Sequence, residues 1–271
     1  LIEDIEYIYD KYGDHPAFYT TTKTSRWSPN DKQKGLFFVW SITFTAGDGH
    51  QVDAEYWQEA LDAIHDLPNG GIVLADVTEG DWIDRGHFDG LYNYATLETN
   101  PTHSFDWAGS IPEGAWYVPS VLPGFSAVRI NYEAETFTPR NDGDTYNNQW
   151  ASALSSGIRP DMVSITSFNE WHEGTQIEPA LPVDEIPSSY TYSDYSPLGS
   201  DAYLDLTKDW VDTYLTSTWP EKYPIQIRLS TTSDWTGLSL LEGAKWIQPF
   251  FETVSEEATM ARFEESNIVL M

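Results

Sequence analysis

Two glutamates, Glu170 and Glu173, directly follow an apolar run, and residues 162–179 read MVSITSFNEWHEGTQIEP. Their spacing lets both side chains face the same side of a turn or of a helix start. Cleavage of a glycosidic bond usually needs a carboxylic acid that protonates the leaving oxygen and a second carboxylate on the anomeric side. Because crowding raises the proton affinity of one of two carboxylates, an acid is kept available near neutral pH. The pair therefore predicts a glycoside-cleaving site.

The residues around this pair allow two interpretations. Glu178 adds a third carboxylate nearby, so the segment could be a solvated loop of an acidic protein. However, the pair follows a strand-like run and alternates with Asn169, Trp171 and His172. Amide, indole and imidazole groups suit the hydroxyls and ring faces of sugars, which favours a carbohydrate site.

Other chemistries fit the sequence less well. His172 begins a segment like the zinc-binding HExxH motif, but Gln176 occupies the place of the second histidine. Asp142 and Asp144 suggest a calcium loop, but Tyr146 stands where the third ligand is required. No G-x-S-x-G pentapeptide is present, although composition alone does not exclude a Ser-His-Asp triad. We expect neither a metal nor a cofactor.

Short apolar runs alternate with amphipathic segments along the chain. The runs predict strands at 35–42, 71–77, 90–95, 115–121 and 162–168. The amphipathic segments predict helices at 1–13, 54–66, 145–157 and 201–215. This alternation indicates an α/β fold with a parallel sheet, either a (β/α)8 barrel or a doubly wound sheet.

Two observations favour the barrel. No glycine-rich phosphate loop follows a strand, and the polar, aromatic-rich segments follow strand carboxyl ends, where barrel enzymes place their sites. Since a barrel needs eight strands and five are recognisable, we expect three strands before residue 1. The 271-residue chain should then be poorly stable or inactive alone, because an open barrel leaves a buried strand edge unpaired.

The sequence changes character after residue 223. Serine and threonine alternate with apolar residues, and turns are predicted at Ser233-Asp234 and Glu242-Gly243. We expect a partial catalytic domain over 1–222 and a truncated β-rich domain over 223–271. A tail packed on the barrel is the alternative for this second segment.

Composition restricts the partners and the environment. With 43 acidic and 14 basic residues the formal net charge is -29, so nucleic acid and anionic membrane surfaces are poor partners. The acidic residues are spread along the chain, which indicates a halophilic protein; an ordinary acidic secreted protein is the alternative. The 12 Trp and 16 Tyr residues can fill a core or line a carbohydrate cleft.

The compartment is less constrained. Cysteine is absent, which excludes disulfides, and no apolar run has membrane-spanning length. No signal peptide is visible, but the chain starts at Leu1 and not at methionine, so we expect the start to be cut. An export leader upstream would make the protein extracellular.

The glutamate segment also carries a family resemblance. Residues 167–178, SFNEWHEGTQIE, resemble the signature of glycoside hydrolase family 99, the endo-α-mannosidases and endo-α-mannanases. Further segments resemble the family in the same order, at residues 12–19 (YGDHPAFY), 88–94 (FDGLYNY) and 118–124 (VPSVLPG). The similarity spans about residues 1–215 and implies a (β/α)8 barrel of which strands four to eight are present.

The resemblance implies retention of anomeric configuration by an unusual route. In the family one glutamate takes the proton of the substrate's own 2-hydroxyl, which closes onto the anomeric carbon as a 1,2-anhydro sugar. By motif position Glu170 matches this base, and Glu173 matches the general acid/base. The substrate would be an internal α-mannosidic bond of an oligosaccharide or polysaccharide.

The resemblance also implies substrate-binding residues. Asn169 would hydrogen-bond the sugar at the cleavage site, and Tyr92 matches a site tyrosine, with Tyr94 an open alternative. Asp194 and Tyr195 would reach the leaving-group subsites. Trp171 and His172 are further candidates, although packing under the loop is the favoured interpretation for Trp171.

Two alternative functions remain. One is a related barrel associated with polysaccharide assembly, and the other is a carbohydrate-binding protein without activity. Both glutamates are intact, which favours the hydrolase. The residues that the family's first three strands supply to substrate binding cannot be read from this chain.

Overall fold

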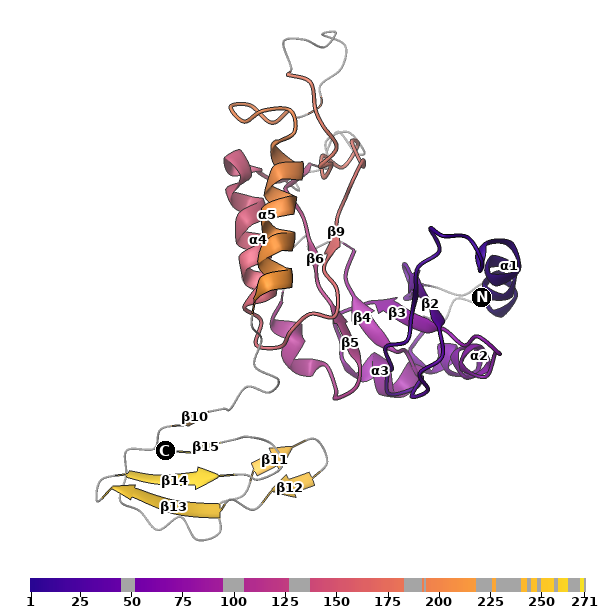
Figure 1. Ribbon diagram of the computed structural model, residues 1–271, viewed down its shortest axis with the longest axis vertical. Coiled ribbons are helices and arrows are strands. Elements are labelled where there is room, and N and C mark those ends of the chain that lie inside the picture. The colour runs from indigo at the N-terminus through magenta and orange to yellow at the C-terminus, as the bar shows by residue number, and fades with distance from the viewer. Residues whose placement is uncertain are drawn as a thin grey trace. The chain divides into compact units, whose positions relative to one another are not determined.

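The computed structural model describes residues 1–44, 52–94, 105–126, 137–182, 192 and 194–217, and beyond these only the backbone of six short strands between 226 and 270. The chain divides into two compact units, Leu1–Thr216 and Ser217–Met271. The first unit holds the curled sheet, and its helices pack on the outside (Figure 1).

The sheet of the first unit is mostly parallel. Its order is β1-β2-β3-β4-β5, and all neighbours from β2 to β5 run parallel. A second parallel pair, β6 with β9, continues the curl in Figure 1. The bounds are β1 Thr20–Thr21, β2 Lys34–Val39, β3 Ile72–Asp76, β4 Gly90–Tyr92, β5 Trp116–Val118, β6 Ser120–Val121 and β9 Ser164–Ile165. This is a partial α/β barrel, and each predicted strand is present in shortened form.

The predicted strand 115–121 is broken in two at Pro119. Proline has no N–H to give to a sheet ladder, so β5 ends before it and β6 begins after it. The Pro119 carbonyl accepts the Ser164 N–H at 3.0 Å. The first half of this stretch, β5, therefore pairs with β4, and the second half, β6, pairs with β9.

The predicted helices agree with the structure to within a few residues. They are α1 Ile2–Tyr12, α2 Glu55–His65, α4 Asp144–Leu154 and α5 Ala202–Thr216. Four elements were not predicted: the helix α3 Asp81–Gly86, strand β1, and the antiparallel strands β7 Phe125–Ser126 and β8 Phe137–Thr138. Two 3-10 turns, η1 Asp106–Ser110 and η3 Asn141–Gly143, complete this unit. Among the described residues no helix combines the length and the apolar character that crossing a membrane requires.

Two faces of the sheet are covered differently. Residues of β3 alternate between them: Val73 and Ala75 pack with Leu61 and Ile64 of α2 on the helix side. On the inner face, the core consists of Ile72, Leu74, Tyr92, Trp116 and Val118. A third core forms where α4 and α5 lie side by side, with the rings of Trp150 and Trp210 stacked at 6.2 Å.

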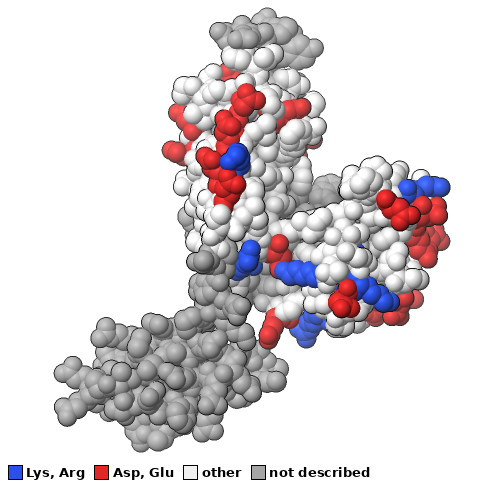
Figure 2. All heavy atoms as spheres, in the orientation of Figure 1, with Lys and Arg blue, Asp and Glu red and all other residues white. Residues whose placement is uncertain are grey.

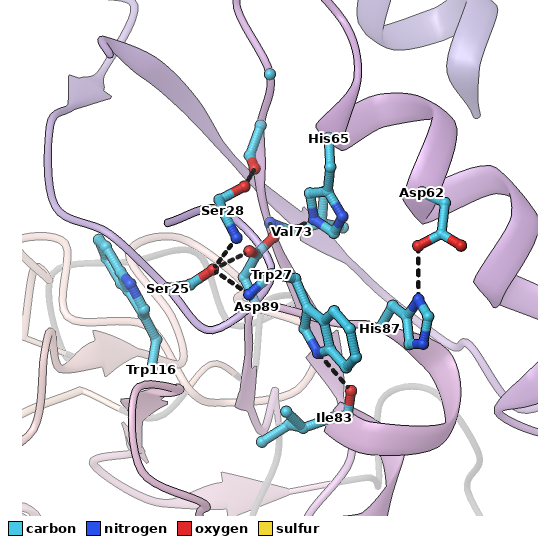
Figure 3. Close-up of polar contacts among 12 residues, drawn as sticks. Ser25, Trp27, Ser28, Asp62, His65, Val73, Ile83, His87, Asp89 and Trp116 are labelled. Carbon is cyan, nitrogen blue, oxygen red and sulfur yellow. Dashed lines mark hydrogen bonds and ion pairs between the residues drawn. The ribbon is translucent and has the colours of Figure 1, made fainter. Parts of the chain in front are cut away.

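A buried polar network closes the amino end of this sheet (Figure 3). Asp89, immediately before β4, is fully buried and accepts the Val73 N–H at 2.7 Å. It also lies 3.0 Å from the His65 ring and accepts the Ser25 hydroxyl. Because residues at this end of barrel strands serve stability, we interpret the network as structural.

The described residues of the second unit form six short strands. Four strands are ordered β10-β15-β14-β13, and β11 pairs antiparallel with β12. Their bounds are β10 Gln226–Ile227, β11 Leu240–Glu242, β12 Lys245–Ile247, β13 Phe250–Ser255, β14 Ala258–Arg262 and β15 Val269–Leu270. Glu242 faces Lys245 across the β11–β12 pair, as a turn at the predicted position requires. The turn predicted at Ser233-Asp234 lies outside the described residues.

Candidate active site

The glutamates lie on a loop, residues 167–178, that follows β9 and is closed by its own hydrogen bonds. The Ser167 N–H donates to the Thr175 carbonyl at 2.9 Å, and the Thr175 N–H donates to the Glu170 carbonyl at 3.2 Å. The Ile177 N–H donates to the Phe168 carbonyl at 3.0 Å, and the Glu170 N–H donates to the Ser167 hydroxyl oxygen at 2.8 Å. We call this segment the acidic loop. These hydrogen bonds close the loop on itself and fix the positions from which its side chains project.

A cation from another segment anchors the acidic loop. One guanidinium nitrogen of Arg140 donates to the carbonyls of Gly174 and Gln176 at 3.0 and 2.6 Å. The Ser126 N–H donates to the Glu173 carbonyl at 2.7 Å. No sequence pattern marks Arg140 for this role, because the carbonyls that it contacts lie more than thirty residues away.

Glu173 is the more protected of the two glutamates. It is half-buried, and its Oε2 accepts the Tyr94 hydroxyl at 3.3 Å. Burial raises the pKa of Glu173 above its ordinary value, the Tyr94 hydrogen bond opposes this, and the nearby Glu170 charge adds to it. Its carboxyl therefore keeps its proton to a higher pH than an exposed glutamate would.

Glu170 is more open to solvent. Its side chain is 42% exposed, and its Oε1 accepts the His172 N–H at 3.2 Å. The His172 ring lies 3.8 Å from the same oxygen. Because the Glu170 charge raises the pKa of both Glu173 and Tyr94, the two carboxyl groups share one electrostatic environment. Two carboxyls that interact but differ in surroundings suit an acid and a base.

Tyr94 contacts Glu173 through its hydroxyl, whereas Tyr92 packs elsewhere. Burial, followed by the charge of Glu173, raises the pKa of Tyr94 to about 12, so its phenol stays a proton donor at neutral pH. Tyr92 is 6% exposed and packs edge-on against Phe38 at 4.9 Å. Burial likewise raises the pKa of Tyr92.

Asp76 is a site neighbour that sequence reasoning missed. It ends β3, and its carboxylate accepts the Tyr94 N–H at 2.8 Å and the backbone N–H of Ser41. Burial raises the pKa of Asp76. An acidic residue at the carboxyl end of a predicted strand could have identified it.

The other predicted residues of the acidic loop differ in exposure. Asn169 is exposed beside Glu170, and its carbonyl accepts the Trp171 N–H at 3.0 Å. The Trp171 indole donates to Glu178 at 2.9 Å, and its ring packs edge-on against Tyr192. Trp171 thus packs within its own segment, whereas the side chain of His172 is 68% exposed.

The two residues predicted for the leaving-group side lie in different settings. Asp194 is partly exposed and accepts the Ser196 hydroxyl at 2.8 Å. Tyr195 is 3% exposed, and its hydroxyl donates toward the carbonyls of Gln176 and Glu178 at 3.1 and 2.5 Å. The Arg140 guanidinium lies 5.0 Å from its ring centre. Tyr195 is therefore a supporting residue of the acidic loop.

A metal site needs several carboxylate or imidazole groups close together. In the described part of the chain, no three acidic or histidine side chains come together in a way that could hold an ion.

Similarity to known proteins covers most of this unit. The family model for glycosyl hydrolase family 99 matches residues 1–216. The glycoprotein endo-alpha-1,2-mannosidase of Xenopus laevis is 34% identical over 230 residues, which are 79% of this chain and 48% of that protein. An endo-alpha-1,2-mannosidase-like protein of Danio rerio is 33% identical over 226 residues, 78% of this chain and 47% of its own. The chain thus spans about half the length of the curated relatives it matches.

Solved structures agree. The GH99 endo-alpha-mannosidase from Bacteroides thetaiotaomicron is similar with a TM-score of 0.64 and 31% identity, over 80% of this chain and 62% of that one. A glycoside hydrolase-like protein at 18% identity, with a TM-score of 0.51 over 77% of this chain and 60% of its own, shares the fold.

Proposed function

The chain belongs to glycosyl hydrolase family 99, and from this we propose that it carries the acid and the base of an enzyme that cleaves internal α-mannosidic bonds with retention. The observation that carries the proposal is the coupled group of Glu170, Glu173 and Tyr94 on the acidic loop and the end of β4. Relatives described as endo-alpha-mannosidases support the substrate class.

In the first step Glu173 is the acid and Glu170 the base. Glu170 takes the proton of the substrate 2-hydroxyl, whose oxygen forms a bond to the anomeric carbon as the bond to the leaving oxygen breaks. Glu173 gives its proton to that leaving oxygen, and its raised pKa suits this donation. The product of this step is a 1,2-anhydro sugar.

In the second step the roles reverse. Glu173 is now a carboxylate and takes a proton from water, whose oxygen attacks the anomeric carbon and opens the three-membered ring. Glu170 returns its proton to the oxygen of the three-membered ring, which becomes the 2-hydroxyl again. Both glutamates are then back in their starting protonation states. Two inversions at one carbon give net retention.

The barrel strands fit the same proposal. β2, β3, β4, the β5–β6 stretch and β9 would be strands four to eight of a (β/α)8 barrel, within a catalytic domain over 1–222. Asn169, His172 and Asp194 would contact the sugar. Residues 223–271 would form a separate β-rich domain.

The test is an activity assay of the full-length gene product on an α-mannan and on a Glc/Man-α-1,2-mannoside. We expect cleavage with retained configuration, read by NMR of the first-formed product. Glu170→Gln and Glu173→Gln should each lower kcat/KM by about 1,000-fold or more, since each removes a proton-transfer group. Glu178→Gln is the matched control, because glutamine can still accept the Trp171 N–H.

Two results would contradict the proposal. Full activity in either of the first two variants would exclude the assigned pair. Binding of mannosides by the unaltered protein without any cleavage would instead support a non-catalytic carbohydrate-binding protein.

A further inference from the structure

Tyr94 lies beyond the hydrogen-bond ladder of its own strand. β4 ends at Tyr92, where its last ladder partners are Asp76 and Val118. The backbone of Tyr94 is therefore not placed by the sheet. Other interactions must fix this backbone if the Tyr94 hydroxyl is to stay in contact with the Glu173 carboxyl group.

Side chains from two other strand ends hold this backbone from both sides. The Tyr94 N–H donates to Asp76 at 2.8 Å, and Asp76 is the last residue of β3. The Tyr94 carbonyl accepts the hydroxyl of Thr166, which follows β9 and is 3% exposed. Both polar groups of the peptide are thus satisfied by side chains that replace the missing ladder.

The same hydrogen bonds extend to the neighbouring strand ends. The hydroxyls of Thr166 and Ser120 lie 2.8 Å apart, and the Ser120 N–H donates to the Asn93 side chain at 3.1 Å. Asn93 and Ser120 are buried. Asp76 also accepts the backbone N–H of Ser41, just beyond β2. A network that satisfies every member in this way fixes one geometry.

We propose that Asp76 is a positioning residue of the site, which acts with Thr166 to hold the Tyr94 backbone so that the phenol meets Glu173. This inference rests on the proposed function in taking Glu173 as the acid. Asp76 accepts two N–H groups at the carboxyl edge of the sheet, where a neutral side chain would avoid the cost of burying a charge. We infer that the position of Tyr94 is what these accepting oxygens secure.

Among the described residues, few titratable groups lie around the contact between the Tyr94 hydroxyl and the Glu173 carboxyl. Glu173 is affected by Tyr94 and Glu170, and Tyr94 is affected by Glu173, Glu170 and Asp76. Asp76 reaches Glu173 only through Tyr94. Losing the Tyr94 hydrogen bond should raise the pKa of Glu173, because that bond favours the ionised form.

The test compares Asp76→Ala, Asp76→Asn, Tyr94→Phe and the double variant Asp76→Ala/Tyr94→Phe in the full-length protein. We expect Asp76→Ala and Tyr94→Phe each to lower kcat about tenfold with little change in KM, because the acid is misplaced. Both should move the basic limb of the kcat/KM profile to higher pH. The double variant should be no worse than Tyr94→Phe, since both changes remove one contact.

Asp76→Asn separates position from charge. Its amide oxygen can still accept the Tyr94 N–H, so this variant should stay near the unaltered protein. A loss equal to that of Asp76→Ala would show that the charge itself acts and would overturn the inference, as would additive effects in the double variant.

Asp161→Ala is the matched control. Asp161 accepts the Tyr117 N–H at 2.8 Å at the opposite end of the sheet and also pairs with Lys23, so its removal costs a hydrogen bond of the same kind together with an ion pair. It should lower stability and leave the pH profile in place. If Asp76→Ala does not fold, Thr166→Val removes the other hold on Tyr94 and should give the same signature.

A titration without substrate separates this inference from the proposed function. The Glu173 carboxyl can be followed by ¹³C NMR in the unaltered protein, Asp76→Ala and Tyr94→Phe. If both variants titrate at higher pH while no mannoside is cleaved, the inference stands and the function fails. If the protein cleaves mannosides but Asp76→Ala leaves the Glu173 titration unchanged, the inference fails and the function stands.

Discussion

Glu170 and Glu173 carry the same chemical group in different surroundings. Glu173 is half-buried under Tyr94, whereas Glu170 reaches solvent and takes an N–H from its own loop. The two residues are three positions apart on one turn. Their side chains therefore face the same side of the loop but are buried to different extents. Local geometry thus distinguishes two residues that the sequence alone presents as equals.

This pairing predicts how one glutamate changes when the other is neutralised. Glu170→Gln should lower the pKa of Glu173, because the Glu170 charge raises it in the unaltered protein. The measurement is the ¹³C titration of the Glu173 carboxyl. Glu178→Gln should leave that titration in place, and an unmoved curve in Glu170→Gln would mean that the two carboxyls do not interact.

At the scale of elements, the acidic loop depends on a residue far from it in sequence. Arg140 holds two loop carbonyls and stacks near the rings of Tyr195 and Tyr203, at 5.0 and 4.6 Å. A planar guanidinium can lie flat along the rings while one of its nitrogens donates to both carbonyls, a geometry that the point charge of an ammonium does not reproduce. The loop's shape is therefore set partly by this cation.

Arg140→Lys should accordingly lower the free energy of unfolding by about 1–3 kcal/mol. It should also reduce kcat, because the acidic loop would lose its anchor. Urea denaturation and steady-state kinetics measure the two effects. Arg159→Lys is the control, since Arg159 lies over the Tyr214 ring away from the loop; equal losses in both variants would argue against an anchoring role.

The buried network at the amino end of the sheet gives a second prediction for elements. Asp89→Ala leaves the Val73 N–H, the Ser25 hydroxyl and the His65 ring without their acceptor. We expect the free energy of unfolding to fall by about 3–5 kcal/mol. Circular dichroism in urea tests this, with the exposed Asp66→Ala as reference; a loss no larger than the reference would contradict it.

Sequence periodicity found the elements that are long enough to show a period. The β3 run and the helices α2 and α5 were predicted closely because each repeats its pattern several times. β1 and α3 have two and six residues, too few for a pattern, and were missed. Glu170 and Glu173 were visible because they share one segment. Asp76 had a local signal, its place at the carboxyl end of a predicted strand. Arg140 joins the site through contacts with distant residues, which no local pattern encodes.

At the scale of the whole molecule, charge is the dominant feature. The net charge is -29, and Figure 2 shows a column of acidic side chains on the first unit. On α5, Asp205, Asp209 and Asp212 recur at helical spacing around Lys208, whose pKa they raise. Like charges at this spacing repel one another.

Salt should therefore stabilise the protein. We expect Tm to rise by several degrees between about 0.1 and 2 M NaCl, because the Debye length falls below the spacing of exposed charges. Differential scanning calorimetry measures this. The variant Asp205→Asn/Asp209→Asn should depend less on salt, and a Tm that falls with NaCl would contradict a halophilic surface.

The break at Pro119 has a consequence for proton transfer. Tyr94 belongs to the part of the sheet that contains β4, whereas Glu173 follows β9, and the two parts meet at this crease. The hydroxyl of Thr166, which follows β9, holds the Tyr94 carbonyl and so ties the two parts together across the crease. The phenol and the carboxyl that it meets are therefore kept in register even though they come from strands that pair separately.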